Sequence, residues 1–156
     1  MQFGFAVLIP TRPWIGLLGL ARAAGTAAGE RRQERIAGEL ELLGSKDRKR
    51  HEREGAEARR RGERRARTQT LDLALGLAEL WLRDVLCICE GAPELIYAVD
   101  RSAELEQDAR AREGEGASVR RGIELVQETR LSLAVNVSEE LALEALAYRL
   151  EALLAN

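Results

Sequence analysis

The stretch LDLALGLAELWLRDVL, from Leu71 to Leu86, decides the fold of this chain. Its apolar residues recur at intervals of three and four, which is the period of one face of an α-helix. A stripe of this width is typical of a helix packed into a core. We therefore predict a buried helix with one apolar series along its face: Leu71, Leu75, Ala78, Leu82, Val85 and Cys89. Further apolar residues fill the flanks of this stripe: Leu73, Leu77, Leu80, Trp81 and Ile88.

A second block, RLSLAVNVSEELALEALAYRLEALL, closes the chain from Arg130 to Leu154. Ser138 precedes Glu139 and Glu140, so its hydroxyl can accept a hydrogen bond from a free N–H of a first helical turn. The two carboxylates then lie at the positive end of the helix dipole. We predict a final helix with one side formed by Leu141, Ala145, Tyr148 and Ala152, and with Leu143, Leu146, Leu150 and Leu153 beside it.

The composition supports helices throughout the chain. Its 156 residues include only three prolines and are rich in Ala, Leu, Glu and Arg, which are good helix formers. A chain of this length buries roughly 70% of its unfolded surface, enough for a real core. We predict an all-α protein, a bundle of about five or six helices with one long, partly basic helix.

Glycines and prolines predict where the helices begin and end. The segment Glu30–Leu43 has helical spacing and is followed by Gly44-Ser45, a natural stop. From Lys46 to Cys89 no proline interrupts the chain, so we expect one long helix whose basic half projects from the core or bends at Gly55 or Gly62. A further helix is expected to start with Ser118 as its cap.

The first 29 residues fit this pattern poorly. Pro10 and Pro13 interrupt an apolar run that no basic residue precedes, so the run lacks the layout of a signal peptide and the length of a span. Five glycines lie in the segment, and each costs up to about 1 kcal/mol in a helix interior. We expect residues 1–29 to be weakly ordered or to form short helices. Residues 30–156 should form the helical domain of a cytoplasmic protein that contacts no membrane.

Two cysteines lie within the long apolar helix. Cys87 and Cys89 are two residues apart, so they point about 200° apart on a helix and cannot jointly hold a metal or form a disulfide. The lone histidine, His51, stands among charged residues, without the buried setting and the nucleophile that a general base needs. We predict reduced thiols, and no catalytic site, cofactor or metal.

The order of these segments resembles the carboxy-terminal domain of the delta-prime subunit of bacterial DNA polymerase III, the stator of the clamp loader. That family places an aromatic residue and an Arg-Asp pair on one helix, Asn-x-Asp in the next loop and Asn-x-Asn before the final helix. Two positions depart, because Ala98 and Ser138 replace one asparagine of each motif. The resemblance covers about Glu30 to Leu154, and its matching residues are Trp81, Arg83, Asp84, Asp100, Asn136, Leu141, Leu143 and Glu144.

The resemblance implies assembly without catalysis. In that family the helices of this domain pack with those of the other clamp loader subunits into a circular collar, which loads the sliding clamp in DNA replication. The chain has no Gly-x-x-x-x-Gly-Lys loop, so we expect no ATP binding by that route. It should therefore be a collar fragment or a truncated relative of the family.

The resemblance also directs attention to single residues. We expect a subunit interface at Trp81, Arg83, Asp84 and Tyr148, although Trp81 suits a core position better and Arg83 with Asp84 also fits a simple surface pair. A structural role in turns or caps is expected for Asp100, Asn136 and Ser138.

A basic block supports a rival hypothesis. Between Lys46 and Arg67 there are eleven Lys or Arg against five Asp or Glu. Such a block fits a phosphate-binding surface, but also a solvated helix with i,i+4 ion pairs, which we favour. The alternative function is thus a stand-alone homo-oligomer, associated through the helices around Trp81 or Tyr148, with a basic helix that binds nucleic acid. The phosphate contacts would be Arg59, Arg60, Arg61, Arg64 and Arg65.

Overall fold

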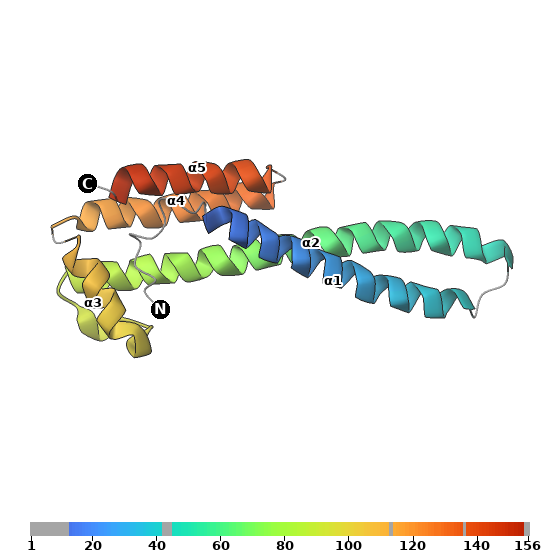
Figure 1. Cartoon of the computed structure of the whole chain (residues 1–156), viewed down its shortest axis with the longest axis horizontal. Helices are drawn as coiled ribbons and strands as arrows, with labels where there is room; N and C mark the ends of the chain where they lie inside the picture. Colours follow the sequence, from blue (N-terminus) through green and yellow to red (C-terminus); the bar gives the residue numbers. More distant parts are fainter. Residues whose placement is uncertain (1–12, 42–44, 113, 136, 155–156) are drawn as a thin grey trace. The chain divides into compact units, whose positions relative to one another are not determined.

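The computed structural model of the chain describes residues 13–41, 45–112, 114–135 and 137–154. Within these ranges the regular structure is helical, with five α-helices, as Figure 1 shows, which confirms the all-α prediction. The long, partly basic helix is α2, from Ser45 to Cys89. The others are α1 (Pro13–Glu41), α3 (Ser102–Arg110), α4 (Gly116–Ala134) and α5 (Glu139–Leu154), with short 3-10 helices η2 (Pro93–Leu95) and η3 (Val99–Arg101).

The chain divides into two compact units. One unit, which we call the hairpin, is formed by residues 17–71 and contains most of α1 and the first part of α2. The other, which we call the bundle, is formed by residues 1–16 and 72–156. The first four residues of α1 and the last eighteen of α2 thus belong to the bundle. The division that we expected between residues 29 and 30 falls inside α1.

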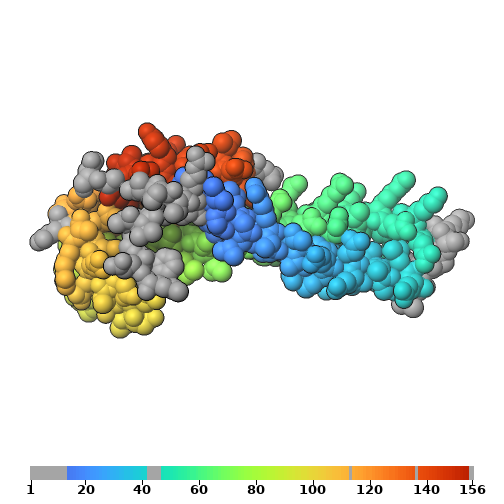
Figure 2. Space-filling view, in the orientation of Figure 1, coloured from blue at the N-terminus to red at the C-terminus, as the bar shows by residue number. Residues whose placement is uncertain are grey.

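Glycines lie where the two helices of the hairpin touch. A Cβ on Gly25 would stand 2.8 Å from Arg67 Cγ and 3.1 Å from the carbonyl oxygen of Glu63. A Cβ on Gly55 would stand 2.9 Å from Ile36 Cδ1. In the space-filling view, atoms of α1 and α2 meet along the hairpin (Figure 2). The missing side chains therefore allow the two helices to approach closely.

This packing corrects the expectation for the glycine-rich start of α1. The segment from Pro13 to residue 29, expected to be weakly ordered or to form short helices, is part of one helix that continues to Glu41. Close packing against α2 stabilises this helix, whereas its local sequence predicted only a weak one. Helix α2 is continuous through both Gly55 and Gly62, the two positions at which a bend was one of the alternatives that we expected for its basic half.

The bundle has its core between α2, α4 and α5. The helix pair α4 and α5 runs antiparallel, as Figure 1 shows. Gly122 of α4 faces both neighbours, since a Cβ there would stand 3.6 Å from Leu82 Cδ1 and 3.5 Å from Leu150 Cδ2. The largest apolar side chains buried in the bundle include Leu75, Leu82, Val85, Leu105, Val119, Val126, Leu143 and Leu146.

Charged side chains fix the direction and register of α4 along α2. Arg130 donates from Nε to Asp72 Oδ1 at 2.9 Å and from Nη1 to Glu79 Oε2 at 2.6 Å. These bonds raise the pKa of the Arg130 guanidinium. At the other end, Arg120 Nη2 lies 3.2 Å from Glu90 Oε1. Because higher residue numbers on α4 pair with lower ones on α2, the two helices are antiparallel.

The start of α4 differs from the prediction, whereas Ser138 takes its predicted place before α5. Helix α4 begins at Gly116, with Glu115 at the cap position and no capping side chain, so Ser118 lies inside the helix. Before α5, Ser138 Oγ accepts from the backbone N–H of Leu141 at 3.5 Å, a long hydrogen bond.

Candidate interaction surfaces

The Asp84 carboxylate holds the loop that follows α2. Asp84 is buried, although it lies on a helix that ends only a turn and a half later. Its Oδ2 accepts hydrogen bonds from the backbone N–H groups of Tyr97 and Ala98, both at 2.9 Å. Its Oδ1 lies 2.8 Å from Arg83 Nη1. Asp84 is therefore not half of a surface pair, because its acceptor sites are filled from within the bundle.

Arg83 joins the same cluster from its exposed side. The guanidinium carbon lies 4.2 Å from the centroid of the Tyr97 ring, within the range of a cation–π contact. Tyr97 itself is 71% exposed, although its backbone is bonded to Asp84. The loop thus presents an aromatic ring to solvent from a fixed backbone position.

An exposed apolar surface continues from this loop along α2. Leu73, Leu77 and Leu80 are spaced by four and three residues, so they lie on one face of the helix, which we call the leucine face. Their exposed fractions are 65, 60 and 44%. Asp84 follows Leu80 by four residues on this face, which places the Tyr97 loop at the end of the leucine face. Contiguous apolar surface of this kind marks interaction sites.

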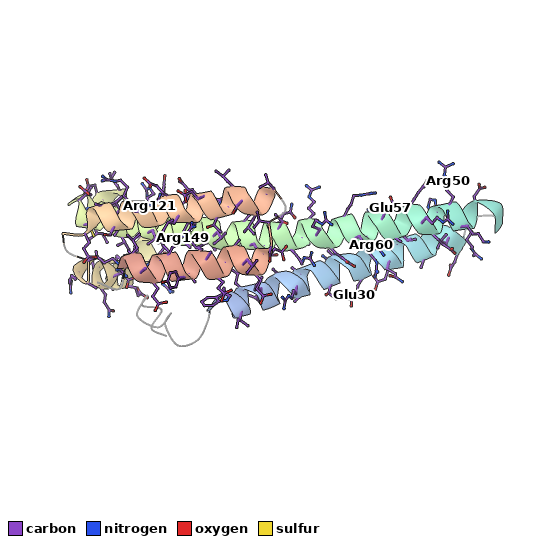
Figure 3. The ribbon with its side chains drawn as sticks, turned by 90° about the horizontal axis from the view of Figure 1, so that it is seen from above. Glu30, Arg50, Glu57, Arg60, Arg121 and Arg149 are labelled. Atoms are coloured by element: carbon purple, nitrogen blue, oxygen red, sulfur yellow. The ribbon has the colours of Figure 1, made fainter. Side chains whose placement is uncertain are left out.

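A second exposed apolar strip lies on α5. Leu141 and Tyr148 share one side of this helix and are 64 and 73% exposed. Of the two series predicted for α5, the one that packs into the core contains Leu143 and Leu146, which are buried. The side with Tyr148 therefore remains accessible. Figure 3 shows the adjacent residue Arg149 on α5.

The other residues singled out from the sequence have different surroundings. Trp81 is half-buried and donates from Nε1 to Asp108 Oδ2 at 2.9 Å, so its polar atom is engaged within the bundle. Asp100 is exposed in η3, and the cap position of α3 is occupied by Arg101, with no capping side chain. Asn136 lies outside the described residues.

Both cysteines are free and half-buried. Cys89 Sγ lies 3.8 Å from the carbonyl oxygen of Ala109, and burial raises the pKa of this thiol. In the part of the chain that the structure describes, His, Cys, Asp and Glu side chains form no cluster suited to a metal ion. None of the described helices is long and apolar enough to cross a membrane.

Charge is segregated between the two units. The hairpin, residues 17–71, contains fifteen Lys or Arg and nine Asp or Glu, an excess of six positive charges. The bundle, residues 1–16 and 72–156, contains nine Lys or Arg and seventeen Asp or Glu, an excess of eight negative charges. The small net charge of the whole chain, -2, therefore hides two oppositely charged units.

The structure separates the five predicted phosphate contacts into two groups. Arg59 is engaged within the hairpin, because its Nη1 donates to Gln33 Oε1 at 3.2 Å and its Nε lies 3.6 Å from Glu63. Arg61 Nη1 lies 3.5 Å from Glu57 Oε2. By contrast, Arg60, Arg64 and Arg65 are exposed, and their side chains form no ion pair or hydrogen bond with the described residues. Figure 3 labels Glu57 and Arg60 on α2.

A groove between α1 and α2 in the hairpin has mixed charge. Its volume is about 330 Å³. The lining includes three arginines and two glutamates, so a bound anion would meet repulsion as well as attraction. The charged lining residues are Arg22, Arg59, Arg67, Glu30 and Glu63.

Three of these features escaped sequence reasoning. The bond between Trp81 and Asp108 joins residues 27 positions apart, and no local pattern marks it. The exposure of Leu77 was hidden because leucines on both sides of α2 made the whole helix look buried. A signal did exist for Asp84: a carboxylate in an apolar helix beside a loop is well placed to accept the free N–H groups of that loop.

Comparisons with protein-family models, with curated proteins and with solved structures found no match to this chain. The resemblance to the delta-prime domain therefore stays a prediction from the sequence motifs.

Proposed function

We propose that this chain is an assembly domain of the bacterial DNA polymerase III clamp loader, similar to the carboxy-terminal domain of the delta-prime subunit. In this role the bundle holds clamp loader subunits together for loading of the sliding clamp. The leucine face carries the proposal. It leaves Leu73, Leu77 and Leu80 accessible on a helix that also contributes to the core. An interface that packs helix against helix requires such a face.

The Tyr97 loop supports the same role. The backbone bonds to Asp84 hold an exposed aromatic residue next to the leucine face, and aromatic residues are enriched at interface centres. On this proposal, Asp84 positions the loop from within, whereas Arg83 and Tyr97 meet the partner. Trp81 contributes through the core, because Asp108 engages its indole N–H.

Binding to purified clamp loader subunits from the same genome tests the proposal. We expect the wild-type chain to co-elute with these subunits in size-exclusion chromatography. The Leu77→Glu variant should bind at least about tenfold more weakly, a loss of about 1.4 kcal/mol, because a buried unpaired carboxylate is costly. Leu20→Glu is the matched control, since Leu20 has a similar exposed fraction, 65%, but lies in the hairpin. A wild-type chain that binds none of these subunits contradicts the proposal.

A second copy of the chain is the alternative partner. The strip with Leu141 and Tyr148 on α5 favours this candidate, because homo-oligomers commonly bury such faces. Sedimentation velocity at tens of micromolar tests it. We expect a dimer or larger species for the wild type and a monomer for Tyr148→Asp. A wild-type monomer at that concentration rules out self-association.

A further inference from the structure

The outer side of α2 in the hairpin carries three arginines without acidic partners. Arg53, Arg60 and Arg64, which we call the arginine row, are exposed, and their side chains form no ion pair or hydrogen bond with the described residues. Gly55 marks the opposite side of α2, where the helix touches Ile36 of α1. The arginine row lies about 140 to 180° around the helix from Gly55 and about 60 to 100° from Glu63, which is close to Gly29 of α1, and its three side chains are exposed.

The spacing of the arginine row suits a regular polyanion. Arg53 and Arg64 are eleven residues apart, or about 16 Å along the helix axis. This length equals the axial rise of roughly five nucleotides in one strand of B-form DNA. Arg60 lies between the two ends, and each guanidinium can donate two parallel hydrogen bonds to a phosphate. The row therefore matches several phosphates of one strand.

The surroundings of the row favour nucleic acid over protein. Among the described residues of the hairpin, Leu20 is the one large apolar side chain that is exposed, so the row has no apolar surface for the core of a protein interface. The hairpin sequence also contains no Phe, Trp or Tyr, so it offers no platform for unpaired bases. The row can therefore recognise a ligand only through charge, and the phosphate backbone of a duplex is bound in this way.

We propose that the arginine row of the hairpin binds the phosphodiester backbone of double-stranded nucleic acid without sequence specificity. This inference is independent of the assembly role proposed for the bundle, and its test uses no clamp loader subunit. If each of the three arginines neutralises one phosphate, the row alone contributes a slope of about −2.7 to a plot of the logarithm of the association constant for the duplex against the logarithm of the salt concentration.

Fluorescence anisotropy with a labelled duplex of about 20 base pairs, titrated between roughly 50 and 200 mM salt, tests the inference. The test variant replaces Arg53, Arg60 and Arg64 with glutamine in the full chain. The control variant replaces Arg50, Arg59 and Arg61 with glutamine. It removes the same number of positive charges from α2, but each of these arginines already pairs with a glutamate. Circular dichroism of both variants is the control for folding, and both should remain helical.

We expect the test variant to bind the duplex at least about tenfold more weakly than the wild type. The salt dependence of its binding should also be shallower, with a slope smaller in magnitude by about 2.7. The control should stay within about threefold of the wild type, because paired arginines release few counterions. Three outcomes overturn the inference. These are a wild type that does not bind the duplex at low salt, an equal loss in both variants, and salt-sensitive self-association that needs the row, which would assign the row to the acidic bundle of a second copy.

Discussion

The Asp84 carboxylate accepts a 2.9 Å hydrogen bond from the backbone N–H of Tyr97, thirteen residues later in the chain. The same oxygen also accepts from Ala98, so a single side chain takes the place of a regular backbone partner for two consecutive loop residues. The carbonyl oxygens of Tyr97 and Ala98 accept backbone hydrogen bonds from Val99 and Arg101, whereas the N–H groups of Tyr97 and Ala98 are bonded to Asp84. Buried donors without an acceptor are costly. The position of the exposed Tyr97 ring therefore depends on one buried carboxylate.

Replacing Asp84 with Ala should destabilise the bundle by about 2–4 kcal/mol, because two backbone donors and Arg83 lose their acceptor. Urea unfolding followed by Trp fluorescence measures this as a lower midpoint with an unchanged slope. The control is Asp100→Ala, which removes an exposed carboxylate of η3 and should change stability by less than about 0.5 kcal/mol. Equal effects of the two substitutions would show that Asp84 does not hold the loop.

The bond between Trp81 Nε1 and Asp108 Oδ2 should appear as an energetic coupling between the two residues. We expect Trp81→Phe and Asp108→Ala each to destabilise the chain, and the double variant to lose less than the sum. The coupling energy should be about 0.5–1.5 kcal/mol, the net value of a typical hydrogen bond. Thermal unfolding followed by circular dichroism measures all four proteins. Additive losses would mean that the bond contributes nothing to stability.

Glycines of the hairpin should respond oppositely to larger side chains. Gly62 has open space around its Cβ position, so Gly62→Ala should stabilise the chain by about 0.5–1 kcal/mol through helix propensity. Gly25 faces Arg67 and the backbone of Glu63, so Gly25→Leu should destabilise the hairpin by about 1–3 kcal/mol through overpacking. Thermal unfolding followed by circular dichroism measures the change in melting temperature of each variant, which should be a rise for Gly62→Ala and a fall for Gly25→Leu. A stabilising Gly25→Leu would contradict the close approach of α1 and α2.

Cys89 should react slowly with alkylating reagents. Burial raises the pKa of its thiol, so less thiolate is present at a given pH than in an ordinary cysteine. In a Cys87→Ser variant, the pH profile of iodoacetamide alkylation should have its midpoint above about 8.5, the value of a free cysteine. The pKa of Cys89 is higher in the folded state than in the unfolded state. The contribution of the neutral thiol to stability is therefore complete at pH values below the unfolded-state pKa, and it is lost as the pH rises through the folded-state pKa. The same profile in denaturant should return to the ordinary midpoint.

The sequence alone determined that the chain is helical and which apolar series of α2 enters the core. Apolar spacing placed Leu75, Leu82 and Val85 in the core, and the structure buries all three. Ser138 likewise marked the start of the last helix. These predictions succeeded because periodicity and capping depend on residues within one or two turns of each other.

Only the tertiary structure decided how the glycines act and which polar groups are engaged. By local propensity Gly25 weakens the helix, whereas in the structure its missing side chain lets α1 approach Glu63 and Arg67 of α2 closely. Arg60 and Arg61 are neighbours in the sequence, yet only Arg61 has an acidic partner within the described residues. For Asp84 the sequence offered a signal, but only the structure identifies its partners, the N–H groups of Tyr97 and Ala98. Such roles depend on what another segment brings close, and local spacing carries no information about segments far away in the sequence.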